Sequence, residues 1–194
     1  MTAAPEGRHP GTAAVAERRR LGMWLFLASL GMLFGGSLVG FLVIRLRAEQ
    51  WPPAGSPGLP SAFLVSTALL VVISALLVAA ERAIRAGDRF RPTAVLTAAS
   101  VLGVAFILSQ VAGWARLAAA SELPQNNLYL FGIYVLSFLH LLHVVGGLVP
   151  LVWITLRSRT GRYTAADHDG VTLTAMYWHF LGVAWLAILA VLAL

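Results

Sequence analysis

Long apolar runs alternate with short polar intervals along most of the chain. Each run has about 20 or more residues, which is the length that an α-helix needs to cross the hydrocarbon core of a bilayer. The intervals contain the proline, glycine and charged residues that end helices. The pattern therefore predicts five transmembrane helices, at about residues 21–44, 61–80, 93–114, 127–156 and 171–194.

The composition agrees with this pattern. Hydrophobic residues make up 59% of the chain and charged residues 11%, and the mean hydropathy is +0.81. A soluble domain of 194 residues is far less apolar. We therefore expect an all-α integral membrane protein, a bundle of five transmembrane helices. Because the chain has no cysteine, disulfides and thiolate chemistry are excluded.

All fourteen basic residues are arginines, and they lie in the polar intervals. Eleven fall on one side of the predicted membrane and three on the other, and an excess of arginine marks the cytoplasmic side. We therefore expect a cytoplasmic N-terminus and a C-terminus on the periplasmic or outer side, and no nucleic-acid partner. The eleven are Arg8, Arg18, Arg19, Arg20, Arg82, Arg85, Arg89, Arg91, Arg157, Arg159 and Arg162, and the three are Arg45, Arg47 and Arg116.

Residues 1–20 are small, polar and basic, which predicts a disordered cytoplasmic arm ahead of a membrane domain over residues 21–194. The run at 21–44 is longer than the apolar core of a signal peptide, and no small-residue cleavage site follows it, so we expect it to stay in the mature protein. This run contains Gly31, Gly35, Gly36 and Gly40. Glycines at such spacing let helices approach closely, so the first span is predicted to be a packing helix.

The polar side chains inside the predicted spans are few. His140 and His143 lie three residues apart and share a helix face, and His179 and Gln110 lie in two other spans. No charged residue lies inside a span, which argues against an ion-coupled transporter or a proton pump. At a rise of about 1.5 Å per residue, His143 and His179 differ in depth by roughly 8 Å, which suits the two axial ligands of one haem poorly. We therefore predict no catalytic, cofactor or metal site in this chain, and expect hydrogen bonds from the imidazoles across helices or to a partner.

Three segments together resemble subunit III of the haem-copper oxidases, in its short five-helix bacterial form. They are residues 21–29 (LGMWLFLAS) followed by FGG at 34–36, residues 138–148 (FLHLLHVVGGL), and residues 177–180 (YWHF) followed by Trp185. Gln110 with Trp114 adds a weaker match. The resemblance covers about residues 21–194.

The resemblance implies a non-catalytic, lipid-contacting subunit that supports oxygen reduction and proton translocation by subunit I of a cytochrome c or quinol oxidase. The haem and copper would belong to subunits I and II, a phospholipid would lie between helices, and the complex would sit in the bacterial cytoplasmic membrane. Residues expected to provide polar packing, lipid contact or subunit contact are His140, His143, His179, Gln110, Tyr177 and Trp178.

Three positions depart from the family pattern. Leu30, Gly113 and Gly182 stand where the family has carboxylates, which puts the roles of those carboxylates in doubt for this chain. Two alternatives to the oxidase subunit remain open. The first is an accessory subunit of a related nitric oxide reductase, and the second is an assembly or scaffold membrane protein.

Overall fold

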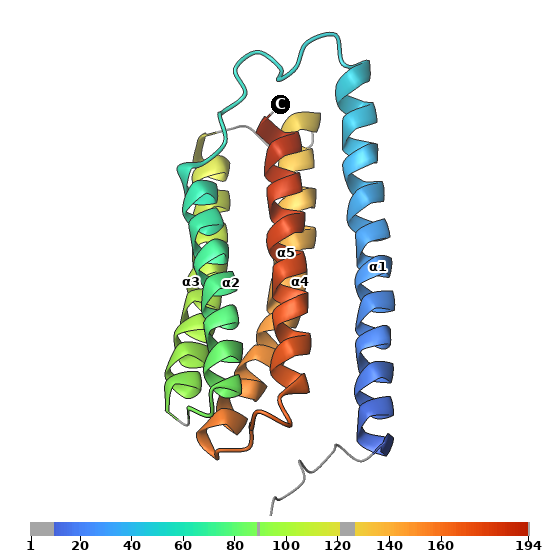
Figure 1. Cartoon of the computed structure of the whole chain (residues 1–194). Coiled ribbons are helices and arrows are strands. Elements are labelled where there is room, and N and C mark those ends of the chain that lie inside the picture. The colour runs from blue at the N-terminus through green and yellow to red at the C-terminus, as the bar shows by residue number, and fades with distance from the viewer. Residues whose placement is uncertain (1–9, 89, 121–126, 194) are drawn as a thin grey trace, which may run out of the picture.

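The computed structural model describes residues 10–88, 90–120 and 127–193, and within these ranges the regular structure is entirely α-helical (Figure 1). All five helices are long and apolar enough to cross a membrane, which confirms the predicted all-α fold. The helices are α1 (Pro10–Arg47), α2 (Ser61–Arg85), α3 (Arg91–Ala120), α4 (Leu128–Arg159) and α5 (Asp169–Ala193).

Most helices extend past the predicted spans. The largest difference is at α1, which begins at Pro10, so that residues 10–20 are helical where a disordered arm was expected. This stretch contains three alanines and three arginines, which are good helix formers, and adding turns to an existing helix avoids the cost of nucleation. Residues 1–9 of the predicted arm, and residue 194 of the last predicted span, lie outside the described residues.

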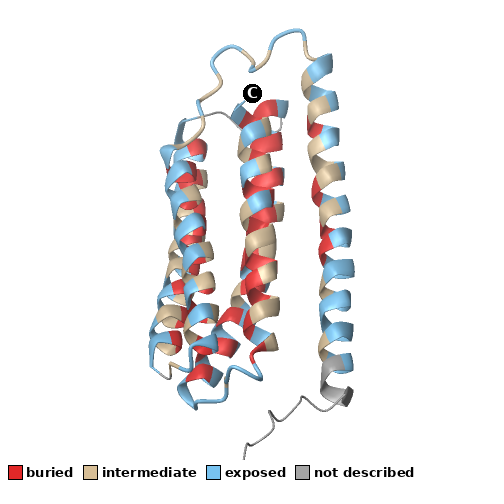
Figure 2. Cartoon of the chain, in the orientation of Figure 1, coloured by how far each residue is buried: buried red, intermediate tan, exposed pale blue. Residues whose placement is uncertain are grey.

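Helices α2, α3, α4 and α5 form a ring in which each packs on its two neighbours, and α1 leans on α4 and α5 from outside (Figure 1). Helix α1 therefore buries a single stripe, made by Leu27, Leu30, Phe34 and Phe41, which recur every three to seven residues. The rest of α1 is mostly exposed or half-buried (Figure 2). Such an apolar outer surface is compatible with lipid.

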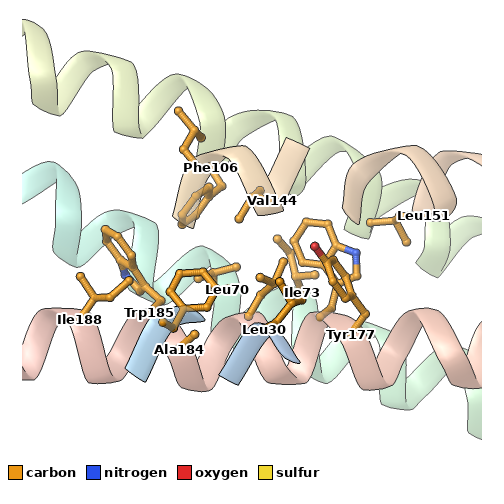
Figure 3. Packing of buried hydrophobic residues seen from close by; sticks show 14 of the residues in the cluster. Leu30, Leu70, Ile73, Phe106, Val144, Leu151, Tyr177, Ala184, Trp185 and Ile188 are labelled. Carbon is orange, nitrogen blue, oxygen red and sulfur yellow. The ribbon is translucent and has the colours of Figure 1, made fainter. Parts of the chain in front are cut away.

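Side chains from all five helices meet in one apolar core (Figure 3). Leu30 from α1, Ile73 from α2, Phe106 from α3, Val144 from α4 and Trp185 from α5 are all at most 6% exposed. The core thus holds the four-helix ring together and fixes α1 against it.

One end of the bundle, where α1, α3 and α5 begin, is called here the arginine-rich end. At this end Arg20 of α1 forms an ion pair of 3.6 Å with Asp169 of α5. Glu81, expected just past a predicted span, lies inside α2, where it accepts a hydrogen bond from Thr172 of α5 and pairs with Arg85 at 3.6 Å. These contacts join α1 and α2 to the start of α5.

Candidate functional site

The three membrane histidines lie in three different environments. His140 is buried between α3, α4 and α5, His143 faces α1 and α5, and His179 faces α2. Among the described residues, no group of three or more histidines and acids could hold a metal ion. The histidines therefore do not form one site, and each is considered separately.

His140 is fully buried and surrounded by aromatic rings. Its ring centroid lies 5.0 Å from that of Trp185, 5.7 Å from that of Phe106 and 6.1 Å from that of Phe34. Neither ring nitrogen has a hydrogen-bond partner among the described residues. His140 therefore does not make the expected hydrogen bond across helices with any described residue.

His143 bonds to its own helix. Its Nδ1–H donates to the main-chain carbonyl of Leu139 at 2.7 Å, and the Phe34 ring of α1 lies 5.1 Å away, centroid to centroid. His179 does make the predicted cross-helix bond, since its Nδ1 lies 2.5 Å from the Ser74 hydroxyl of α2. One of the three imidazoles thus joins two helices of this chain.

Two side chains of α5 donate hydrogen bonds to main-chain carbonyls of α4. The Tyr177 hydroxyl donates to the carbonyl of His143 at 2.8 Å, and the Trp178 indole N–H donates to the carbonyl of Gly147 at 3.1 Å. A carbonyl oxygen has two lone pairs, so it can accept this second bond besides its helical one. Buried tyrosine and tryptophan need such acceptors in a lipid-surrounded bundle. We call this pair of bonds the α4–α5 clamp.

Gly147 makes the clamp possible. A Cβ atom built at Gly147 would lie 2.4 Å from Tyr177 Cε1, which is far inside van der Waals contact. At the neighbouring Gly146 a Cβ would lie 4.0 Å from the Tyr177 hydroxyl. Of these two consecutive positions, only Gly147 therefore requires glycine for the tyrosine to reach α4.

A groove of about 550 Å³ opens beside the clamp, between α1, α4 and α5. Trp153 lies at its wall, with the Arg157 guanidinium 4.8 Å from the centre of the indole ring. The groove thus has an apolar body, with a cation held close to it by Trp153. Its lining is formed by Met23, Phe26, Leu142, His143, Gly146, Pro150, Trp153, Ile154, Gly170, Leu173, Thr174 and Tyr177. We call it the α1–α4–α5 groove.

The glycines of α1 are not where helices approach most closely within this chain. A Cβ at Gly31 would lie 3.9 Å from Phe180, and at Gly35, Gly36 and Gly40 it would meet nothing within 4 Å. The close approach of α1 is instead at Gly132 of α4, where a Cβ would lie 2.1 Å from Phe41. The four closely spaced glycines of α1 predicted a packing helix from the sequence, whereas the isolated Gly132 gave no such indication.

Leu30, Gly113 and Gly182, the three positions where the resemblance led us to expect carboxylates, have different surroundings. Leu30 is buried in the core. A Cβ at Gly113 would lie 3.1 Å from Phe63 Cε1, so the Phe63 ring occupies the space beside it. Gly182 faces open space and borders a hollow of about 360 Å³ between α2 and α5, next to His179. Leucine and phenylalanine therefore fill two of the three places with apolar side chains.

Comparison with known proteins agrees with the resemblance to subunit III. The family model for cytochrome c oxidase subunit III matches residues 1–193. Cytochrome c oxidase subunit 3 of Thermostichus vulcanus is 32% identical over 177 residues, which are 90% of this chain and 86% of that protein. The protein of the same name from a Synechocystis strain is 29% identical, over 89% of this chain and 73% of that protein. A probable cytochrome c oxidase subunit 3 of Nocardia farcinica is 26% identical, over 88% and 84%.

The family match extends over all five helices and includes both segments that the clamp joins. One relative also exceeds 30% identity across most of both chains. The chain therefore belongs to the cytochrome c oxidase subunit III family.

Proposed function

We propose that this chain is the non-catalytic subunit III of a respiratory haem-copper oxidase and supports oxygen reduction and proton translocation by subunit I. Its family membership carries this proposal. The haem and copper would be held by the partner subunits I and II. The separate engagement of His140, His143 and His179 supports a structural role for these residues in this chain.

The proposal places the arginine-rich end in the cytoplasm and the chain in a bacterial cytoplasmic membrane. The excess of arginine at this end is the support, because cytoplasmic segments near membrane helices are enriched in basic residues. Fusion of a reporter to the C-terminus tests it. Alkaline phosphatase, which is active only in the periplasm, should be active when it is fused there. Activity of a reporter that works only in the cytoplasm, fused at the same position, would mean that the chain has the opposite orientation.

The α1–α4–α5 groove is the proposed site of a bound phospholipid. Its apolar lining suits an acyl chain, and Arg157 provides a cation for the headgroup phosphate. Arginine binds phosphate through several donors and near a membrane surface attracts anionic lipid by about 1 kcal/mol. The groove would therefore retain phosphatidylglycerol better than a neutral lipid.

Lipid retention can be measured by native mass spectrometry of the purified complex. Arg157→Gln should reduce bound phosphatidylglycerol by about fivefold, the equivalent of ~1 kcal/mol. Arg159→Gln is the matched control, because it removes an exposed arginine of the same helical turn and leaves the contact between Arg157 and Trp153 in place. Equal retention in both variants would remove Arg157 from the lipid site.

The partner proposal is tested by purifying the tagged chain from its own membranes in mild detergent. Mass spectrometry should find two further oxidase subunits, of the kinds that hold haem and copper. Recovery of nitric oxide reductase subunits would support the accessory-subunit alternative, and recovery of assembly factors would support the scaffold alternative. The relatives reported above favour the oxidase over both.

A further inference from the structure

Two polar side chains in the core have no hydrogen-bond partner among the described residues. Gln110 on α3 and His140 on α4 are both fully buried, and all four of their side-chain nitrogen and oxygen atoms lack a partner. Other buried polar side chains of the bundle, such as Ser66, Ser137 and Thr155, are bonded. Apart from Nδ1 of His168, which lies just before α5, these two residues carry all the buried side-chain nitrogen and oxygen atoms without a partner among the described residues.

Neighbouring contacts place the two residues at the same level of the bundle. On α3, Gln110 lies one helical turn from Phe106 and one turn from Trp114. Phe106 contacts the His140 ring at 5.7 Å between centroids, and the Trp114 indole N–H donates to the Ser137 hydroxyl at 2.9 Å. Since Ser137 and His140 occupy one turn of α4, Gln110 faces that turn between its two flanking contacts.

No other described residue provides a partner. The rings of Phe34, Phe106 and Trp185 enclose His140, and complete burial closes both residues to lipid headgroups and to a partner chain. Buried polar groups that stay unbonded cost free energy comparable to a lost hydrogen bond. This cost favours a small hydrogen-bonding molecule between the two side chains.

The chemistry of the two side chains suits water. A primary amide and a neutral imidazole each offer both a donor and an acceptor, and water can bond to both kinds. Buried waters in proteins typically make two to four such bonds with otherwise unsatisfied groups. A metal ion suits this position poorly. Its ligands would be one imidazole and one amide oxygen without a carboxylate, and no group of three or more metal-binding side chains occurs among the described residues.

We propose that one buried water molecule binds between Gln110 and His140 and links α3 to α4 inside the membrane. With the Trp114–Ser137 bond one turn away, this link fixes how α3 and α4 are aligned along their axes. The role belongs to the fold of the chain, and it does not depend on the identity of the partner subunits.

Solid-state NMR of the full chain in lipid nanodiscs tests the proposal. With ring-labelled histidine, the wild-type protein should show magnetisation transfer from water protons to the His140 ring, assigned by its disappearance in His140→Phe. The transfer should be lost in Gln110→Met, a variant of similar length that cannot hydrogen-bond in this way. The ring signals of His179, which faces a different helix pair, should be the same in both proteins.

Each other result overturns the proposal. Absence of water transfer at His140 in the wild-type protein removes the water. Transfer from the Gln110 amide protons without transfer from water means a direct hydrogen bond. Transfer that persists unchanged in Gln110→Met means that Gln110 does not hold the water. The first two outcomes are read from the wild-type spectrum, so they do not require Gln110→Met to fold.

Discussion

The hydroxyl of Tyr177 donates a hydrogen bond of 2.8 Å to the main-chain carbonyl of His143, on the neighbouring helix. Trp178 repeats this one turn further along, at the carbonyl of Gly147. Two sequence motifs that lie more than thirty residues apart are therefore the two halves of a single contact. The donors come from the YWHF segment, and the acceptors come from the segment that contains the histidine pair.

The first prediction concerns the tyrosine hydroxyl. Tyr177→Phe removes one hydrogen bond between α4 and α5 and should lower the free energy of unfolding by about 1 kcal/mol, as for other buried or intramembrane hydrogen bonds. Reversible unfolding of the chain in bicelles measures the change. Tyr163→Phe is the control, because Tyr163 lies between α4 and α5 along the chain and outside the clamp. Equal stability of the two variants would mean that the hydrogen bond of the Tyr177 hydroxyl contributes nothing to stability.

Substitution of two consecutive glycines tests the geometry of the clamp. Gly147→Ala forces a methyl group against the Tyr177 ring and should cost about 1–3 kcal/mol, the usual range for overpacking. Gly146→Ala places its methyl group at ordinary contact distance and should change stability by less than about 0.5 kcal/mol. The same unfolding assay applies. A larger effect at Gly146 would contradict the described alignment of α4 and α5.

The position of α1 can be tested in a similar way. Gly132→Ala places a methyl group against the ring of Phe41, which is buried and packs edge-on against Trp51 at 5.4 Å between centroids. We expect a loss of about 1–3 kcal/mol and a displaced α1, visible as an increased distance between spin labels on α1 and α4. Gly35→Ala, at a position that faces open space, should leave both the stability and the distance unchanged. Destabilisation by Gly35→Ala in the isolated chain would restore the predicted packing role of that glycine.

Asp88 gives a prediction about pH. Hydrogen bonds from the backbone N–H groups of Arg91 and Phe90 hold the pKa of its carboxyl below the ordinary value of 3.8. The ionised form therefore stabilises the start of α3, fully so above pH 3.8, and this contribution is lost as the pH falls through the lower pKa of the folded state. Asp88→Ala should be less stable than wild type at neutral pH, and the difference should shrink on acidification below pH 3.8. A difference that stays constant through this range would rule out the carboxylate as its cause.

The number of spans and the all-α fold could be predicted because about twenty consecutive apolar residues have one stable solution in a bilayer. The buried face of each helix could not, since lipid-facing side chains are as apolar as core ones and leave little periodicity. His140 and His143 show the consequence. They are three residues apart and were expected to share a helix face, yet the rotation of about 60° between them puts one in the core and the other in a groove.

The glycines illustrate the same limit. Four glycines in α1 predicted close packing, whereas close contacts between helices occur at glycines of α4, at Gly132 and Gly147. Whether a glycine is needed depends on which ring faces it from another helix, and that depends on the alignment of helices far apart in sequence. The motif match, in contrast, identified the family from the residues alone, and the comparisons confirmed it.

The most direct test of the proposed role is the reduced-minus-oxidised absorption spectrum of the tagged chain, purified in mild detergent from the membranes in which it is normally made. Membership of a respiratory oxidase predicts haem bands that co-elute with the chain at constant stoichiometry through a second column. A purified chain with no haem absorbance, although the oxidase remains intact elsewhere in the same extract, would contradict the proposal.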